Sequence, residues 1–519
     1  MTRYLGIDSS TQSITGLIID TESAAIVADE SINFDEHFGE SYGVENGVVD
    51  KGNGVVHSYP LMWLDGLDRL LLTLRESGHD LSRISAIAGS GQQHGTVYLN
   101  NSAVKARKSL NSSRSLSEQL SGIFSRETAP IWMDSSTGRQ CREIEDGVGG
   151  QDVLLDLTGN TAFERFSGPQ IRKFYQDEAD AYADTAEIGL VSSFIASVLA
   201  GKRGPVDAGD ASGTNLMDIK TRSWSTRALD ATAPDLLGKL APVTSSGTAV
   251  GPIHKYFADR YGFSTDCQVF PFSGDNPSSL IGLGLVEPGH VALSLGTSDT
   301  LFACMSQPRV SDEGEGCVFA SPDDENYMAL ICFMNGSLAR EAIRDRFRLD
   351  WDGFTNALKT SEPGNGGSLL LPYFDPEIVP RVDAGVVRKN LGEDDAQGNV
   401  RAVIEAQAMS SHIHSRWMGV PITSLFVTGG ASLNEEILKV FANVLGCAVH
   451  RFETTNAAAL GAALRAYQGH QPDISWPDVT GPFCQPISGT TIQPDPSTRK
   501  TYDALIDSYT ELEQQHIKS

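Results

Sequence analysis

Long apolar runs are absent from this 519-residue sequence, in which no stretch of about 18 apolar residues occurs. The first residues, MTRYLGIDSS, lack the apolar core of a signal peptide and are themselves a strand candidate. These two absences predict a cytoplasmic protein with no membrane partner.

Cysteine is also sparse, with 7 residues scattered along the chain and no CxxC pair or Cys/His cluster. Such spacing argues against a zinc site or a redox dithiol, and it is typical of a reducing compartment.

Basic residues are outnumbered, because 40 Lys and Arg stand against 66 Asp and Glu, for a formal charge of -26. Since nucleic-acid binding needs clustered basic residues, we expect no nucleic-acid partner. The balance does not exclude an anionic small substrate, because the field inside a cleft can oppose the net charge.

What is present is the composition of a globular protein, with 40% hydrophobic and 20% charged residues and enough length for two domains or more. Strand-like runs alternate with helix-like ones, which predicts an α/β fold. Leucines on one helical face predict a helix from Pro60, and strand candidates follow at residues 84–88, 291–295 and 425–427. Residues 101–127 are Ser-rich and basic, and they predict a long surface segment.

The stretch LGIDSSTQSITGLIID, residues 5–20, places a loop of hydroxyl and amide side chains between two apolar runs. An ordinary hairpin turns on two residues such as Asn-Gly, so this loop needs another explanation. LSLGTSDTLFAC, residues 293–304, has the same plan, either by chance or because the chain holds two similar halves. In the second interpretation each half presents a phosphate-facing loop, since hydroxyls and glycine backbone suit phosphate oxygens. Asp8 would then hold Mg²⁺, directly or through water.

Two further motifs have both a structural and a functional interpretation. TGGAS, residues 428–432, lies between a strand and a helix, where glycine backbone can approach a flat ring or a phosphate. The same turn also occurs in α/β proteins that bind no nucleotide, and neither G-x-G-x-x-G nor the Walker A pattern is present in a matching context. FSGDNPSSL, residues 272–280, holds Asp275 either as a turn or N-cap residue or as a general base for phosphoryl transfer.

GSGQQHGTVYL, residues 89–99, carries His94, which is either a structural histidine or a hydrogen-bonding group for a polyol. ERFSGPQIRKF, residues 164–174, offers Arg165, Gln170 and Lys173, and its plain interpretation is a solvated basic face.

Together these motifs resemble the FGGY carbohydrate kinases, a family with a duplicated actin-like ATPase fold, through about residues 4–466. GIDSST resembles the first phosphate loop, LSLGTSDTLF the second, and FVTGGASLNEEILKVFANVLGCAV the C-terminal signature with its adenosine-site loop. GSGQQHGTVY, WMDSSTGRQC, TGNTAFERFSGPQI, SGDNPSSL and CFMNGSLARE are similar to the subgroup that phosphorylates D-xylulose. One departure is that Lys173 is followed by FYQDEADAY, where the wider family has a tryptophan.

The resemblance implies an α/β fold of two actin-like ATPase (ribonuclease H-like) domains flanking a central cleft. We expect an N-terminal sugar-binding domain over residues 1–283, a C-terminal domain over 284–470 and an extension over 471–519. The implied reaction is phosphorylation of D-xylulose to D-xylulose 5-phosphate, with ATP and Mg²⁺, by a monomer or homodimer. The alternatives are a sister kinase for ribulose or an alditol, a non-catalytic actin-like ATPase scaffold, and a sugar-responsive regulator, although no DNA-binding pattern is evident.

The resemblance also implies roles for individual residues. Asp275 is the expected general base, and Asp8 is the expected Mg²⁺ residue. The expected sugar-binding residues are His94, Arg165, Asp275 and Asn276. The residues expected to contact ATP are Asp8, Thr11, Gln12, Gly296, Thr297, Ser298, Trp351, Gly430, Ala431 and Asn434.

Overall fold

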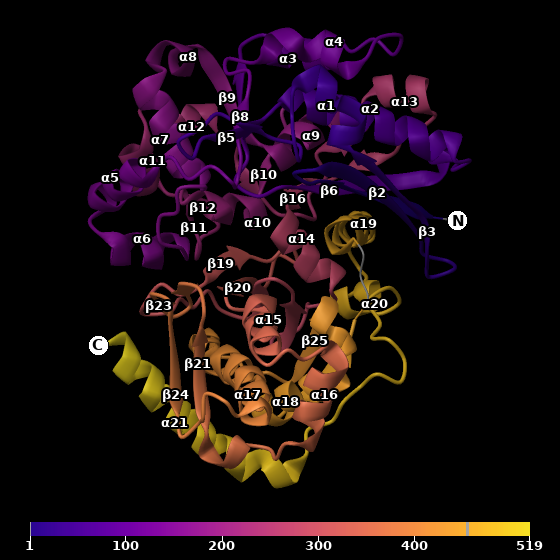
Figure 1. Ribbon diagram of the computed structural model, residues 1–519. Helices are drawn as coiled ribbons and strands as arrows, with labels where there is room; N and C mark the ends of the chain where they lie inside the picture. Colours follow the sequence, from indigo (N-terminus) through magenta and orange to yellow (C-terminus); the bar gives the residue numbers. More distant parts are fainter. Residues whose placement is uncertain (1, 453–455, 519) are drawn as a thin grey trace. The chain divides into compact units, whose positions relative to one another are not determined.

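The computed structural model describes residues 2–452 and 456–518, which pack into two compact units (Figure 1). Unit 1 contains the chain as far as Val286, the segment Val318–Tyr327 and the segment Asn456–Cys484. Unit 2 contains Glu287–Cys317, the chain from Met328 to residue 452, and the chain from Gln485 onward. Both units combine strands and helices, so the expected α/β architecture is confirmed.

The main sheet of unit 1 has the strand order β14-β15-β6-β1-β2-β3. A meander of β1 (Arg3–Ser9), β2 (Ser13–Asp20) and β3 (Ala25–Asn33) is antiparallel, whereas β6 (Ile84–Gly91) runs parallel to β1. The short strand β15 (Gln268–Val269) is parallel to β6. The first phosphate-loop candidate is therefore the β1–β2 hairpin, and it lies at the end of β1 beside the end of β6.

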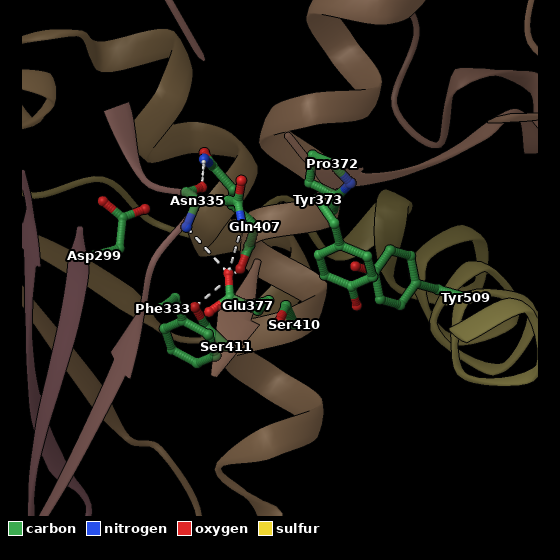
Figure 2. Close-up of a pocket in the computed structure, with 11 residues that line it drawn as sticks. Asp299, Phe333, Asn335, Pro372, Tyr373, Glu377, Gln407, Ser410, Ser411 and Tyr509 are labelled. Atoms are coloured by element: carbon green, nitrogen blue, oxygen red, sulfur yellow. Dashed lines mark hydrogen bonds between the residues drawn. The ribbon is translucent and has the colours of Figure 1, made fainter. Parts of the chain in front are cut away.

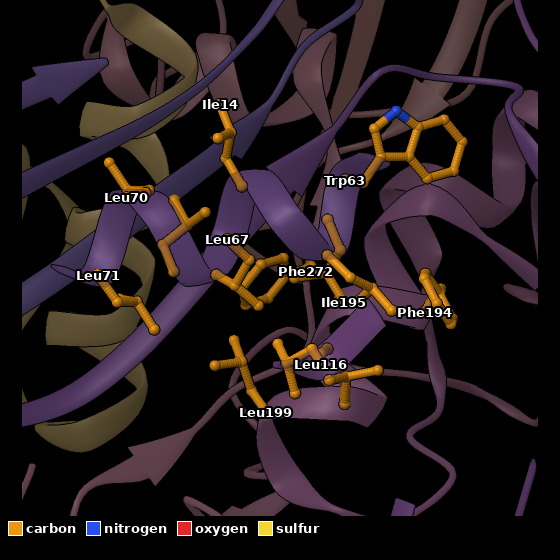
Figure 3. Close-up of a cluster of buried hydrophobic side chains, with 14 of the residues drawn as sticks. Ile14, Trp63, Leu67, Leu70, Leu71, Leu116, Phe194, Ile195, Leu199 and Phe272 are labelled. Atoms are coloured by element: carbon orange, nitrogen blue, oxygen red, sulfur yellow. The ribbon is translucent and has the colours of Figure 1, made fainter. Parts of the chain in front are cut away.

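The hydrophobic core of unit 1 is built around α2 (Pro60–Glu76), the helix that the leucine spacing predicts. Proline at the first helical position has its φ angle already set for a helix, and the leucines repeat on one face. Figure 3 shows Leu67 and Leu71 of this helix in the same cluster as Leu199 and Phe272. This core packs against one face of the sheet whose strands β1 and β2 form the hairpin.

Helix α19 (Ala457–His470) packs in unit 1 although it comes late in the chain. It lies so close to α14 (Asp275–Gly282) that a Cβ on Gly282 would be 1.9 Å from the Ala457 carbonyl oxygen, and one on Gly461 would be 1.8 Å from that of Ser278. Only glycine permits this approach. The predicted ranges 1–283, 284–470 and 471–519 stay a prediction about domains, while packing places α19 with unit 1.

The sheet of unit 2 contains the order β20-β18-β17-β25-β26. In it, β17 (His290–Leu295) is antiparallel to β18 (Asp299–Met305) and parallel to β25 (Ser424–Thr428), which is parallel to β26 (Ala448–Arg451). The strands β2, β1, β6 and β15 of unit 1 have the same order and directions. This correspondence favours two similar halves over a chance match between the loops at residues 5–20 and 293–304.

The remainder of each unit consists of helices and small sheets. Those of unit 1 include α1 (Phe34–Tyr42), α3 (Ala103–Lys108), α4 (Leu116–Leu120), α5 (Gly138–Val148), α6 (Gln151–Thr158), α7 (Ser167–Asp177), α9 (Val191–Ala200) and α13 (Lys255–Tyr261). Those of unit 2 include α15 (Ser337–Arg346), α16 (Trp351–Thr360), α17 (Ala396–His414), α18 (Glu435–Leu445) and α21 (Arg499–Ile517). None of the helices within residues 2–452 and 456–518 is long and apolar enough to cross a membrane.

Candidate active site

The carboxylate of Asp8 lies at the end of β1, where it is held by hydroxyl groups. Ser10 Oγ donates to one of its oxygens, and Ser90 Oγ donates to the other at 2.7 Å, from the neighbouring strand β6. Burial raises the pKa of Asp8, and these two hydroxyls oppose that rise. The hydroxyl-rich sequence therefore serves first to hold an otherwise costly buried carboxylate.

The tip of the β1–β2 hairpin carries Thr11 and Gln12, and the Gln12 side chain is exposed. Thr11 Oγ1 donates to Gln92 Oε1 at 3.1 Å and accepts from Trp132 Nε1 at 2.8 Å. These contacts anchor the loop to Gln92, directly after β6, and to Trp132, further along the chain.

Asp275 is the first residue of α14, and its side chain does not act as the N-cap, because the cap residue is Gly274. The backbone N–H of Gln93 donates to Asp275 Oδ1 at 3.2 Å, and the backbone N–H and Nδ2 of Asn276 donate to it at 2.9 and 3.2 Å. Burial, followed by the charge of Asp8, raises the pKa of Asp275 to about 7 in spite of these donors. A carboxylate that exchanges its proton near neutral pH is suited to general base catalysis.

His94 has a positive φ angle of 73°. A hydrogen bond from its ring fixes the tautomer of the imidazole. Its Nδ1 is 2.7 Å from the carbonyl oxygen of Gly213, and since a carbonyl only accepts, Nδ1 carries the proton. The ring stacks on Phe166 with 4.3 Å between centroids. Burial, followed by the charge of Arg165, lowers the pKa of His94 to about 3, so the ring is neutral. Nε2 is consequently an acceptor, the group that a sugar hydroxyl requires.

Several buried donors near these residues have no hydrogen-bond partner within the described part of the chain: Gln92 Nε2, Gln93 Nε2 and Arg165 Nε. Buried donors are normally paired, so unpaired ones beside Asp275 and His94 indicate a polar ligand. Arg165 and Asn276 were predicted for this site, whereas the two glutamines were not. Their only sequence signal is their place in the GSGQQHG motif.

The plain interpretation of residues 164–174 as a solvated basic face is wrong for Gln170, which is 2% exposed. Its Nε2 donates to Asp134 Oδ1 and to the Glu164 carbonyl oxygen, both at 2.9 Å. Lys173 Nζ donates to Ser136 Oγ at 2.7 Å. Both side chains therefore fix the segment that carries Arg165.

Unit 2 contains a cavity of about 810 Å³, within the size range of small-molecule sites. Trp351, which is 44% exposed, and Leu433, 69% exposed, provide apolar lining. The predicted nucleotide residues that line this cavity are Gly296, Thr297, Trp351, Gly430, Ala431 and Asn434. Ser298 follows Thr297 in the β17–β18 loop. The structure thus brings residues from three separate sequence motifs to one cavity large enough for a nucleoside.

Asn434 has a structural task as well as a place in this cavity. It is the N-cap of α18, and its Oδ1 accepts from the backbone N–H groups of Glu436 and Ile437 at 3.1 and 3.4 Å. Its Nδ2 donates to Thr355 Oγ1 at 2.8 Å. Gly430 faces open space, because a Cβ built there meets nothing within 4 Å. The expected position of TGGAS between a strand and a helix is confirmed.

The chemistry of unit 1 suits a divalent cation at Asp8. Within the described residues no group of three or more His, Cys, Asp or Glu side chains could hold a metal ion by itself. Asp8 is nevertheless a buried carboxylate and Asp275 a half-buried one, and their mutual repulsion contributes to the raised pKa of Asp275. Mg²⁺ prefers one or two carboxylates and takes its remaining ligands from water and phosphates, so these residues fit it.

Two sheets of matching order, each with a polar hairpin loop after its first strand, match the duplicated actin-like ATPase fold. Structural comparison agrees: a xylulose kinase from Rhodospirillum rubrum is similar with a TM-score of 0.82 and 19% identity, covering 99% of this chain and 98% of that one. At this identity the likeness concerns the fold.

The sequence comparisons are more specific. Residues 127–282 match the N-terminal domain of the FGGY family of carbohydrate kinases, and residues 291–468 match its C-terminal domain. The chain is 42% identical to a xylulose kinase of Rattus norvegicus, covering 98% of this chain and 96% of that one. It is 43% identical to xylulose kinase 2 of Arabidopsis thaliana, covering 90% and 87%. The chain belongs to the FGGY family of carbohydrate kinases, so the predicted family and enzyme class are confirmed.

Proposed function

We propose that this protein transfers the γ-phosphoryl group of ATP to D-xylulose, giving D-xylulose 5-phosphate and ADP. Relatives named xylulose kinase, 42% and 43% identical to it, support this substrate. The observation that carries the chemistry is Asp275, a half-buried carboxylate whose pKa lies at about 7 beside a neutral histidine and unpaired buried donors.

In the proposed reaction Asp275 takes the proton of the attacking sugar hydroxyl. As that O–H bond breaks, a bond forms from the hydroxyl oxygen to the γ-phosphorus, and the bond from that phosphorus to the bridging oxygen of ADP breaks. Three N–H groups converge on Asp275 Oδ1, which leaves Oδ2 as the better acceptor for the proton. Such positioned proton transfer contributes about 10²–10⁴-fold to a rate.

The sugar is bound by acceptors and donors in unit 1. His94 Nε2 accepts a hydrogen bond from one hydroxyl, Arg165 and Gln93 donate to sugar oxygens, and Asn276 contacts the sugar beside them. The His94–Phe166 stack and the hydrogen bond to Gly213 fix the direction of the imidazole before any sugar arrives. This preorganisation selects a polyol over an apolar ligand of the same size.

The residues proposed to contact ATP come from two parts of the chain. In unit 1, Asp8, Thr11 and Gln12 face the phosphates, and Asp8 would hold the Mg²⁺ of MgATP, directly or through water. In unit 2, Gly296, Thr297 and Ser298 bind phosphate, and Trp351, Gly430, Ala431 and Asn434 surround the adenosine. Mg²⁺, when bound, neutralises charge on the transferring phosphoryl group. A cytoplasmic location and a monomeric or homodimeric state belong to the same proposal.

The test is an ADP-release assay with MgATP and a panel of D-xylulose, D-ribulose, xylitol and ribitol, for the unaltered protein and for D275N. A matched control is D68N, because Asp68 is a carboxylate of unit 1 that is buried and hydrogen-bonded to Tyr256 and Tyr261. We expect D-xylulose turnover that falls about 10²–10⁴-fold in D275N and persists in D68N.

The remaining outcomes are equally decisive. Turnover on another member of the panel, without turnover on D-xylulose, would overturn the substrate but keep the kinase mechanism. Equal activity of D275N and the unaltered protein would remove Asp275 from the base role. Sugar-independent ADP release would contradict the kinase proposal itself.

A further inference from the structure

Arg340 of α15 is 1% exposed, and its guanidinium contacts both ends of the β17–β18 loop. Its two terminal nitrogens donate to the two carboxylate oxygens of Asp299 at 2.9 and 3.0 Å. One of them also donates to the carbonyl oxygen of Gly296 at 3.2 Å. Gly296 precedes the two residues at the loop tip, and Asp299 follows them. The planar guanidinium of Arg340 therefore bridges the two ends of the loop.

The N-terminus of α15 contacts the same loop. The backbone N–H of Ser337 donates to the carbonyl oxygens of Gly296 and Thr297 at 2.9 and 3.1 Å. Gly336 lies so close that a Cβ there would be 2.7 Å from the carbonyl oxygen of Thr297 and from the backbone nitrogen of Asp299. The loop carbonyls, which would repel phosphate oxygens, are therefore engaged by the helix.

Gln407 of α17 continues the network on the far side of Arg340. Its Oε1 accepts from Arg340 at 2.9 Å, and its Nε2 donates to the carbonyl oxygens of Asn335 and Gly336 at 2.8 and 2.9 Å. Thus the same arginine and glutamine link the loop, the start of α15 and the middle of α17.

Figure 2 shows Asp299, Asn335 and Gln407 around a small cavity of about 20 Å³, room for a single water. Glu377, on the cavity wall, accepts from the backbone N–H groups of Met334 and Asn335 at 2.7 and 3.0 Å. The turn that leads into α15 is consequently fixed by a carboxylate, as the loop is fixed by an ion pair.

This network is a costly way to stabilise a fold. Both side chains of the Arg340–Asp299 pair are nearly inaccessible, at 1% and 4% exposure, and a buried ion pair often contributes no more than well-packed apolar residues would. What it does provide is geometry, because a guanidinium fork holds a carboxylate and a carbonyl in fixed directions. Arg340 also lines the 810 Å³ cavity, together with the loop residues Gly296 and Thr297.

We infer that Arg340 is a positioning residue for nucleotide phosphate binding, which holds residues 296–298 in their binding conformation through Asp299 and Gly296. The inference rests on the proposed function for the identity of the ligand, since the loop must meet phosphate groups. Adenosine, which has no phosphate, is bound by the other parts of the cavity and does not depend on Arg340.

The test compares R340K with R107K in the full-length protein. Lysine keeps the charge but cannot bridge Asp299 and Gly296 together. Arg107 is the matched control, because it is also 1% exposed and its Nη2 donates to both carboxylate oxygens of Glu187, at 2.8 and 2.7 Å, in unit 1. Dissociation constants for ATP, ADP and adenosine are measured by calorimetry, together with KM for MgATP and for D-xylulose.

We expect R340K to bind ATP and ADP about tenfold more weakly, with unchanged adenosine affinity, a raised KM for MgATP and an unchanged KM for D-xylulose. R107K loses thermal stability only. D299N removes the same ion pair with no change in size, and it reproduces the ATP-specific loss even if R340K does not fold.

Two results would overturn the inference: unchanged ATP affinity in R340K and D299N, or equal weakening of ATP and adenosine, which would indicate collapse of the whole cavity. If the unaltered protein binds ATP but phosphorylates no sugar, the proposed function fails, yet the comparison of ATP with adenosine still decides the role of Arg340.

Discussion

At Asp275, burial and the nearby charge of Asp8 raise the pKa, while N–H donors from Gln93 and Asn276 lower it. The balance places the pKa at about 7, whereas burial without those donors would keep the acid protonated at neutral pH. A proton acceptor must be ionised before reaction yet basic enough to hold the proton afterwards, and this environment satisfies both conditions.

The raised pKa of Asp275 has a consequence for stability that can be measured. Its value is about 7 in the folded chain and 3.8 as the ordinary value, so the native state holds the proton more tightly. The stability from this proton is fully present below pH 3.8 and is lost as pH rises to about 7. D275N has no such proton. Its free energy of unfolding, relative to that of the unaltered protein, should therefore increase between pH 3.8 and about pH 7, by at most about 4 kcal/mol.

Urea unfolding of both proteins from pH 4 to 8 checks this expectation, and kcat for D-xylulose should rise over the upper part of the same range as Asp275 ionises. Stability curves that run parallel across the range would mean that the carboxylate is not held in the protonated form. The same result would weaken its assignment as a base that works near neutrality.

Individual roles at this site were only partly predictable. GSGQQHG marked His94 as a candidate, but its tautomer depends on the Gly213 carbonyl, a contact between residues far apart in sequence. Gln93 was missed because its contribution is a backbone N–H and an unpaired amide, and any residue supplies the first. Chemical type can be inferred from the sequence, whereas hydrogen-bond partners require the fold.

Helix α21 shows the same limit for a whole element. The extension expected over residues 471–519 contains α21, a helix of mostly polar sequence, and its Tyr502, Tyr509 and Glu513 are buried. Tyr502 donates to Glu405 at 2.9 Å, and Glu513 accepts from Tyr373 at 2.7 Å. The packed face also carries Leu505 and Ile506, so its apolar part follows the helical spacing, whereas the polar partners that these side chains find elsewhere in unit 2 have no local signal.

The contact between α21 and α17 depends on a charged histidine. His414 is flanked by Glu315, 2.9 Å from its Nδ1, and by Glu513, 3.1 Å from its Nε2. Burial alone would lower the pKa of His414, but the hydrogen bonds and charges of the two carboxylates outweigh it and raise the pKa to about 9. The stability from this proton is fully present below pH 6.5 and is lost as pH rises to about 9.

We therefore expect H414Q to be less stable than the unaltered protein by about 3 kcal/mol at pH 6, with a difference that shrinks toward pH 9. The control is H412Q on the same helix, because burial and then the charge of Arg416 lower the pKa of His412 to about 4, so it stays neutral in this range. Denaturation midpoints from pH 6 to 9 are the measurement. A constant difference for H414Q would show that His414 is neutral in the folded chain.

Elements with strong internal patterns were predicted closely, and those that depend on partners were not. The helix from Pro60 and the run from β25 to α18 match their expected positions, because leucine spacing and the Asn434 cap are local signals. Residues 101–127, expected as a surface segment, form α3 and α4 with Arg107 buried against Glu187. No local sequence pattern predicts an ion pair between two residues that lie so far apart in the sequence.

For the whole molecule, the sequences of two short loops indicate the duplicated plan, but they do not indicate that α19 belongs to unit 1. That helix packs against β1, where a Cβ on Gly6 would lie 2.0 Å from the Ala459 carbonyl oxygen. Sequence order places residues 457–470 with the second half of the chain, and only the close approach through glycines shows that they complete unit 1.

The two units are expected to respond to different ligands. The residues proposed for the sugar lie in unit 1, whereas the cavity proposed for adenosine is lined by residues of unit 2. D-xylulose alone should slow amide hydrogen exchange in residues 89–99 and 272–280, and adenosine alone should slow it in residues 430–437. At a ligand concentration of ten times the dissociation constant, amides that exchange only through an opening that the bound ligand prevents should exchange about tenfold more slowly.

Hydrogen exchange followed by mass spectrometry resolves these segments, and α5 (Gly138–Val148) serves as an internal control that neither ligand should protect. Because a ligand stabilises only what it contacts or orders, protection of residues 430–437 by D-xylulose alone would contradict the assignment of the sugar to unit 1. Protection of residues 89–99 by adenosine alone would likewise place the nucleoside outside the 810 Å³ cavity. Either result would require the two sites to be reassigned before any role of Asp275 or Arg340 is tested.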